Sequence, residues 1–353
     1  TEFTNISTCS DVTPFACTGT VSKVPDAGVS DEEPTLFNGS YNRPAAFTSS
    51  LPVSTADFGS VNSVFSQVFG VAVTTKLYAE MQAAGHTVDG TTTGLPTLSS
   101  TQVANLFSQS IKTQGWKGIT TAANEGVGVN VCTRDIGSGT RAAINTLFLQ
   151  NGANGLLPFK AKPAQSNVTA ASDVAGKFFI NEAGSGGGVV TCLGNVNALA
   201  SKGFGVGLLT LGQGTNANYK FVAIDGVVPS RDNAKVGKYG AWVESTIQTN
   251  KSAVNGGLSA GALGFLNAFI TKATNADNLG QVGVPAIAGV FALPLSGSTV
   301  ADADCSAYGN TTPATYPAMG DTTLPATAAA AADYFCSRYT RGGVSTNVPA
   351  FTK

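Results

Sequence analysis

The chain has 353 residues, enough for one large domain or two ordinary ones with a substantial hydrophobic core. Its 20 Lys and Arg nearly balance 21 Asp and Glu, which argues against a protein that binds nucleic acid or another polyanion. Only 12% of the residues are charged and no apolar run reaches the ~18 residues of a membrane span, so we expect a secreted or cell-surface protein kept soluble by small polar groups.

The first 65 residues are rich in turn signals and predict loops. The segment from Cys9 to Cys17 contains Pro14 and predicts a surface loop rather than a strand. The chain begins with Thr1 instead of Met, so we expect that a signal peptide has been removed.

Two elements follow in quick succession. Phe65–Val73 predicts a strand that leads into a helix over Thr74–Ala84. A second helix is expected over Leu98–Ile111, because Ser99 and Ser100 are good N-caps and the apolar residues that follow lie on one face.

The segment Val131–Leu149 is the most informative part of the chain. An apolar run ending at Val131 predicts a buried strand, and a Gly-Ser-Gly-Thr turn then leads into helix formers from Ala142 onward. A helix that starts at such a turn presents unpaired N–H groups and the positive end of its macrodipole, which suits an anion. The candidate ligands are Ser138, Gly139 and Thr140, with Arg134 and Arg141 on either side. An ordinary capped helix is the alternative interpretation.

The remaining elements complete an α/β pattern with mainly parallel sheets. The Gly184–Gly188 run predicts a flexible turn, in which Gly187 could add backbone donors to a site. The expected elements after it are a helix beginning within Val189–Ala200, strands at Phe204–Leu209 and Tyr219–Ile224, and a helix at Leu258–Thr274. Beyond Ser296 the chain is rich in Pro, Thr and Ala, and we expect a tail.

Six cysteines are compatible with three disulfides, and proximity in the sequence favours three pairs. These pairs are Cys9–Cys17, Cys132–Cys192 and Cys305–Cys336. Disulfides indicate an oxidising compartment, whereas six buried free thiols remain the alternative. The spacing fits no zinc site, and His86 is the single histidine, so no metal or other cofactor is expected.

The sequence offers little for catalysis. Gly257-Leu258-Ser259-Ala260-Gly261 matches the letters of a nucleophile elbow, but no strand precedes it and His86 is the one residue that could act as its base. We therefore predict a protein that is not an enzyme.

Several segments, in order, resemble the phosphate-type periplasmic solute-binding proteins, the substrate-binding components of phosphate ABC transporters. Arg134-x-x-x-Ser138-Gly139-Thr140 is similar to the family's Arg-x-Asp-Gly-Ser-Gly-Thr loop, and Asp26–Pro34 is similar to its Gly-x-Ser-Asp-x-Pro segment. Weaker similarities extend through Leu98–Trp116, 183–207 and Val222–Tyr239, so that the set spans residues 26–290.

The resemblance implies a two-lobed periplasmic-binding-protein-like fold with the ligand in a cleft between the lobes. Residues 1–72 and 241–296 would form the first lobe, 73–240 the second, and 297–353 a tail tethered by a disulfide. In the family the Arg, Ser and Thr of the loop hold the oxyanion, and the Asp of the second segment accepts a proton from it. Carried onto this sequence, these roles fall to Arg134, Ser138, Thr140 and Asp31, with Ser30 beside them.

The chain departs from the family in two places. Ile136 stands where the family has the Asp that orients the Arg, and an acid lies one position earlier at Asp135. The residues before Asp31 look like a closed loop instead of the family's first strand. We therefore expect that a retained N-terminal peptide or self-association completes the first lobe.

The sequence predicts an extracytoplasmic binding protein, periplasmic or extracellular, for phosphate or a similar tetrahedral oxyanion. An ABC permease is the partner that the resemblance implies. A structural or adhesive cell-surface protein on the same fold is the alternative, since a fold does not determine a function.

Overall fold

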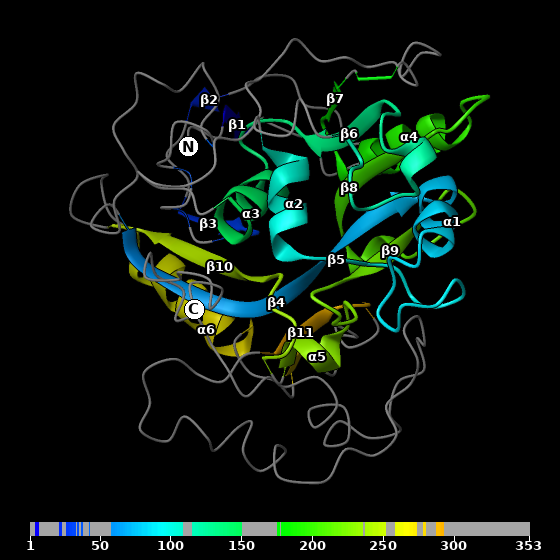
Figure 1. The fold of residues 1–353 in the computed structure, drawn as a ribbon. Coiled ribbons are helices and arrows are strands. Elements are labelled where there is room, and N and C mark those ends of the chain that lie inside the picture. Colours follow the sequence, from blue (N-terminus) through cyan, green and yellow to red (C-terminus); the bar gives the residue numbers. More distant parts are fainter. Residues whose placement is uncertain are drawn as a thin grey trace, which may run out of the picture.

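The protein has an α/β fold, which confirms the predicted class. The computed structural model describes residues 4–6, 21–22, 26–32, 34, 37, 42, 58–108, 115–149, 175–176, 178–235, 237–251, 258–273, 278–279 and 287–292. A nine-stranded sheet forms the framework of the described residues, with helices packed against it (Figure 1).

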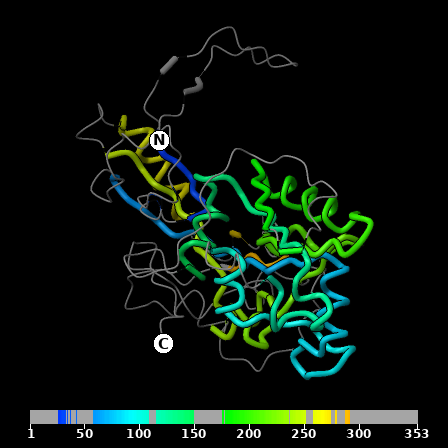
Figure 2. Tube along the Cα trace, turned by 45° about the horizontal axis from the view of Figure 1, so that its top comes forward, coloured from blue at the N-terminus to red at the C-terminus, as the bar shows by residue number. Residues whose placement is uncertain are grey.

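The 17-residue strand β4, Phe58–Thr74, connects the two parts of the sheet. Its first two thirds pair with β10 (Trp242–Asn250) and β11 (Val290–Ala292), and its last third pairs with β8 (Gly205–Thr210) and β9 (Tyr219–Ile224). All four pairings are antiparallel. Figure 2 shows β4 extending from the smaller group around β10 into the larger α/β body.

The larger part of the sheet is parallel beyond β4. Strand β6 (Val129–Arg134) lies between β8 and β7 (Phe178–Ala183) and runs parallel to both, and β5 (Thr97–Leu98) runs parallel to β9. The sheet is thus mixed, and the predicted parallel pairing holds for these three contacts.

Helices cover both faces of the parallel strands. Cys132 of β6 is disulfide-bonded to Cys192 of α4, Gly186–Asn197. Glu182 of β7 lies opposite Thr133 of β6. Since neighbouring residues of a strand point to opposite faces, Glu182 lies on the other face of the sheet from Cys132. There it forms an ion pair with Arg141 of α3, Gly139–Leu147. The helices α3 and α4 therefore lie on opposite faces of the sheet (Figure 1).

The core lies where α1 (Thr75–Ala83), α2 (Ser100–Phe107), α3 and α4 meet the sheet. Its largest fully buried side chain is Trp116, whose ring meets Phe204 edge to face at 6.3 Å and whose Nε1 donates to the Gly128 carbonyl at 3.3 Å. Thr74 joins the end of β4 to β8 and α1. Its Oγ1 donates to the Gly203 carbonyl at 2.8 Å and accepts from the N–H groups of Gly205 at 3.2 Å and Leu77 at 3.4 Å.

The smaller part of the sheet consists of β10, the first half of β4 and the edge strand β3, Ala27–Ser30. Buried polar side chains hold it together. Ser63 donates to Glu244 Oε2 at 2.7 Å, and Thr246 donates to the Glu32 carbonyl at 3.1 Å. The helix α6, Ala260–Ala273, packs against β4 and buries Leu266.

The sequence prediction is wrong at two points. The residues before Asp31 do form strands, namely β1 (Thr4–Ile6), β2 (Val21–Ser22) and β3. The glycines 186–188 form the first turn of α4 and are not a loop, because the Ser185 hydroxyl accepts from the Gly188 N–H at 3.0 Å and starts the helix there.

Other predicted features are confirmed or remain open. The helices expected near 74–84, 98–111, 189–200 and 258–274 are α1, α2, α4 and α6. The Cys132–Cys192 pair is confirmed, whereas Cys9–Cys17, Cys305–Cys336 and the tail at 297–353 lie outside the described residues. The proposed lobe boundaries stay a prediction.

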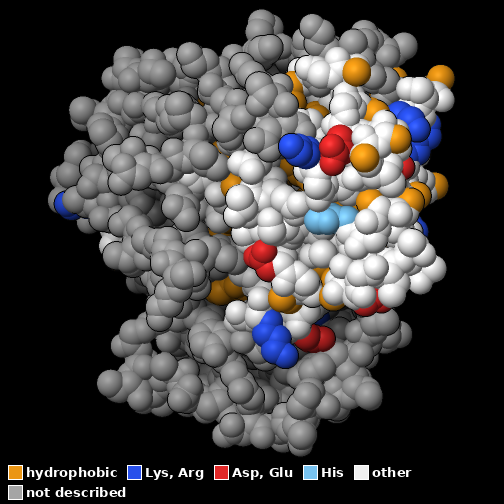
Figure 3. Space-filling model, in the orientation of Figure 1, with side chains coloured by type: hydrophobic (Ala, Val, Ile, Leu, Met, Phe, Trp, Pro, Cys, Tyr) orange, Lys and Arg blue, Asp and Glu red, His pale blue; other side chains and the backbone are white. Residues whose placement is uncertain are grey.

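On the face that Figure 3 shows, the described residues carry few charges, and some of these lie as adjacent positive and negative groups. None of the helices in the described ranges is both long and apolar enough to cross a membrane.

We expect the Cys132–Cys192 disulfide to stabilise the fold substantially. It closes a loop across a sequence separation of 60, so replacing both residues by Ser should lower the free energy of unfolding by about 4 kcal/mol. Urea unfolding without reductant measures this loss, and the untreated wild type is the control because its other cysteines are unchanged. A loss below about 1 kcal/mol would contradict a constraining role.

Glu80 should make stability depend on pH. Burial raises the pKa of its carboxyl, but hydrogen bonds from Asn124 and Thr121, together with Lys202, outweigh burial and hold the pKa below its ordinary value of 4.5. The contribution is therefore present above that value and is lost as the pH falls through the lower, folded-state pKa. Glu80→Gln should flatten the acid limb of the free energy of unfolding against pH, and an unchanged limb would exclude this contribution.

Candidate anion-binding site

The candidate site lies at the carboxyl ends of β6 and β7. Arg134 and Ala183 are paired at the ends of these parallel strands, and the chain then leaves toward α3 on one face and α4 on the other. The crevice at such a divergence is where open α/β sheets bind ligands.

Ser138 begins α3 but does not cap it. It lies at the N-cap position, yet its side chain accepts no hydrogen bond from the first turn. Its hydroxyl is buried and has no hydrogen-bond partner among the described residues, and the residue is 8% exposed. The N-caps Thr74, Ser99 and Ser185 behave differently, because each accepts from a backbone N–H of its own helix.

The first turn of α3 is enclosed. Gly139, Thr140 and Arg141 are all buried. Among the described residues no acceptor is found for the Gly139 and Thr140 N–H groups, as expected for the start of an α-helix. A buried helix start with an idle N-cap hydroxyl leaves several donors to be satisfied by something else.

Asp31 lies directly against this helix start. A Cβ added to Gly139 would come within 2.8 Å of the Asp31 Cβ and 3.2 Å of its Oδ2. Residue 139 is therefore glycine because the Asp31 side chain occupies the space beside it. Two segments more than a hundred residues apart, both named as candidate ligands from the sequence, are thus adjacent.

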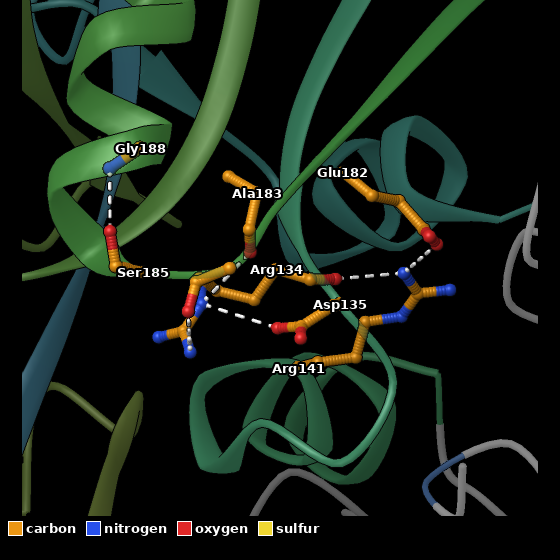
Figure 4. A network of polar contacts seen from close by, with 8 residues as sticks. Arg134, Asp135, Arg141, Glu182, Ala183, Ser185 and Gly188 are labelled. Atoms are coloured by element: carbon orange, nitrogen blue, oxygen red, sulfur yellow. Dashed lines mark hydrogen bonds and ion pairs between the residues drawn. The ribbon is translucent and has the colours of Figure 1, made fainter. Parts of the chain in front are cut away.

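Arg134 is held by the backbone of the next strand. Its Nε donates to the Ala183 carbonyl at 3.2 Å and its Nη2 to the Gly184 carbonyl at 3.1 Å. Asp135 Oδ1 lies 3.6 Å from the same Nε, with the Asp135 side chain 53% exposed. The guanidinium lies on the Ser185 side of the strands (Figure 4). These contacts fix its direction, and within the described residues none of them involves Nη1.

Arg141 points the other way. Its Nη1 donates to Glu182 Oε1 at 2.6 Å and to the Arg134 carbonyl at 2.9 Å, on the far side of the strands from the Arg134 guanidinium (Figure 4). The two arginines that flank the loop in sequence therefore have different partners.

The other candidate residues lie close to these in sequence. The Ser30 hydroxyl accepts from the Glu32 N–H at 3.3 Å, and Gly187 is exposed in the first turn of α4. Sequence reasoning missed Glu182 and Gln213. Gln213 follows β8, and its Nε2 would lie 3.3 Å from a Cβ on Gly186. Both residues lie at the carboxyl ends of parallel strands, where open α/β sheets bind ligands. Applying this rule to the predicted strands could have identified them.

The two residues of the nucleophile-elbow alternative that could react, Ser259 and His86, both lie among the described residues. Within the described ranges, no three His, Cys, Asp or Glu side chains gather as metal ligands would. Ser259 caps α6, accepting from the Ala262 N–H at 3.1 Å, and His86 Nε2 lies 3.2 Å from Gln102 Oε1. Each residue of the nucleophile-elbow alternative thus has an ordinary structural contact.

No protein-family model and no curated protein matches this chain. Among solved structures, an ABC-type phosphate transport receptor from Vibrio cholerae is similar, with 14% identity, a TM-score of 0.40 and coverage of 73% of this chain and 78% of that one. PstS from Borrelia burgdorferi shows 14% identity, a TM-score of 0.33 and coverage of 63% and 70%. With TM-scores below 0.5, neither likeness establishes the family of this chain.

The free energy of unfolding of a Gly139→Ala variant tests the contact between Asp31 and Gly139. Gly139→Ala should lower the free energy of unfolding by roughly 1–3 kcal/mol through overpacking, although Ala is favoured over Gly in a helix by about 1 kcal/mol. Gly264→Ala in α6 is the matched control, because nothing lies within 4 Å of its added Cβ. If both variants gain stability equally in urea unfolding, Asp31 does not pack against Gly139.

Proposed function

We propose that this chain binds a tetrahedral oxyanion, with phosphate preferred, at the start of α3, and that it does so without catalysis. The observation that carries the proposal is the buried Ser138 hydroxyl, which has no partner among the described residues and does not cap its own helix. Buried polar groups are nearly always paired, so one left idle beside unpaired N–H groups indicates a missing acceptor.

An oxyanion would satisfy these donors together. One oxygen would accept from the Ser138 hydroxyl, and others would accept from the N–H groups of Gly139 and Thr140. The positive end of the α3 macrodipole favours the negative charge. Arg134 would contribute its charge through Nη1, since Nε and Nη2 already bind carbonyls.

Asp31 gives the site a requirement on the ligand. Its carboxylate lies against Gly139, where a fully deprotonated anion would meet like charge. A ligand that carries a proton can instead donate a hydrogen bond to this carboxylate. Phosphate keeps a proton near neutral pH and sulfate does not, so this arrangement favours phosphate over sulfate.

The disulfide supports the extracytoplasmic location that the sequence suggests, because such bonds persist in oxidising compartments. An ABC permease as partner, self-association and a retained N-terminal peptide stay predictions.

The alternative, a structural or adhesive protein, is favoured by one observation. The helix α6 exposes apolar side chains, with Phe265 69% exposed and stacked on Phe269 at 6.3 Å. Exposed apolar clusters of this kind commonly mark contact surfaces. Phosphate titration separates the two functions, because the alternative needs no anion.

Isothermal titration with phosphate tests the proposal. Arg134→Ala should weaken binding by roughly 2–5 kcal/mol, because an enclosed anion loses its cation. Ser138→Ala should cost about 1–2 kcal/mol for one hydroxyl donor.

The control for these variants is Ser99→Ala, which removes a capping hydroxyl from α2 and should leave phosphate binding unchanged. Absence of heat with millimolar phosphate or arsenate in the wild type would overturn the proposed function and favour the alternative.

A further inference from the structure

We propose that Glu182 is a positioning residue for the anion site and acts through Arg141. This inference rests on the proposed function, because it concerns how the start of α3 is held ready for the ligand. Glu182 would not touch the anion itself.

The pair is nearly excluded from solvent. Arg141 Nη1 lies 2.6 Å from Glu182 Oε1, and the two side chains are 4% and 10% exposed. The same Nη1 also donates to the carbonyl of Arg134 at 2.9 Å. One nitrogen therefore joins the first turn of α3 to the last residue of β6 and to β7.

These contacts fix the loop that contains the site from both ends. The loop consists of residues 135–138, and at its start the Asp135 N–H donates to the Ala183 carbonyl at 3.1 Å. Gly137, at φ 94°, makes the turn inside it. At its end, Arg141 ties α3 back to the residue where the loop began. The direction of the Ser138 hydroxyl and of the first N–H groups of α3 thus depends on the Arg141–Glu182 contact.

Residues 182–184 serve both arginines. The carbonyls of Ala183 and Gly184 orient the Arg134 guanidinium, and the carboxylate of Glu182 holds Arg141 on the opposite face of the sheet. The end of β7 therefore contributes to the position of both the Arg134 guanidinium and the start of α3.

A direct role for Arg141 as anion ligand makes the opposite prediction. Glu182→Gln removes a negative charge beside Arg141 and makes the surroundings of the site more positive. If Arg141 held the anion, this change would strengthen phosphate binding. If the pair positions the loop, the change weakens binding, because a neutral amide holds a buried guanidinium less firmly.

The experiment measures the phosphate dissociation constant of the full chain at a temperature where circular dichroism shows each variant folded. Glu182→Gln should raise the dissociation constant about tenfold, the lower end of the loss that follows when the hydrogen-bond partner of a metal-ligating side chain is removed. Arg141→Lys should also raise it, since a single ammonium cannot reproduce the planar donor geometry of the guanidinium.

Glu80→Gln is the matched control, because Glu80 is also a partly buried carboxylate, lies on α1 and accepts a hydrogen bond from Thr121. The phosphate dissociation constant of this variant should equal that of the wild type. A merely structural role would lower the melting temperature without changing the dissociation constant of the folded protein.

The outcomes separate the two proposals. If the wild type does not bind phosphate, the proposed function fails. If the wild type binds and Glu182→Gln binds equally well or more tightly, the positioning role is overturned and the proposed function stands. If Glu182→Gln does not fold, Arg141→Lys decides the question by the same comparison, with unchanged affinity counting against the positioning role.

Discussion

The 17 residues of β4 satisfy their backbone hydrogen bonds with four different strands, and the remaining architecture follows from this requirement. Backbone N–H and C=O groups need partners along the whole strand, and β10, β11, β8 and β9 supply them over successive stretches of β4. The pairing with β10 and β11 at one end and with β8 and β9 at the other joins the polar, hydrogen-bonded smaller part of the sheet to the larger hydrophobic core. The parallel strands β6 and β7 extend outward from β8, so the candidate site lies at an edge fixed by β4.

The candidate site illustrates how a sheet edge gathers residues that are distant in the sequence. Arg134, Glu182 and Gln213 come from the ends of three adjacent strands, and Asp31 arrives from the N-terminal segment. Among the N-cap residues of α1 to α4, Ser138 is the one whose hydroxyl accepts no hydrogen bond from its own helix. At Thr74, Ser99 and Ser185 the hydroxyl accepts a hydrogen bond from the first turn of its helix, so the different state of Ser138 does not follow from its residue type.

Local sequence patterns were sufficient for elements with an apolar stripe or run, such as α2, β8 and β9. They failed at β10, because Glu244, Thr246 and Gln248 are buried yet polar and satisfy one another and their neighbours by hydrogen bonds. An alternation of polar and apolar residues is absent there, so no periodicity marks the strand. The Asp31–Gly139 contact was reachable through the family resemblance alone. The Arg141–Glu182 pair, separated by 41 residues, has no local signal and becomes visible when the register of β6 and β7 is known.

The Cys132–Cys192 disulfide determines what happens to the protein when a protease cuts the chain between these two cysteines. The loop that begins at Asp135, the start of α3 and the whole of β7 lie between the two cysteines in the chain. A single backbone cut anywhere in this span leaves the two pieces covalently joined through sulfur, and the sheet pairing of β6 with β7 and β8 continues to hold them in register. A cut in this span therefore does not release either piece, and reduction of the disulfide is needed to separate them.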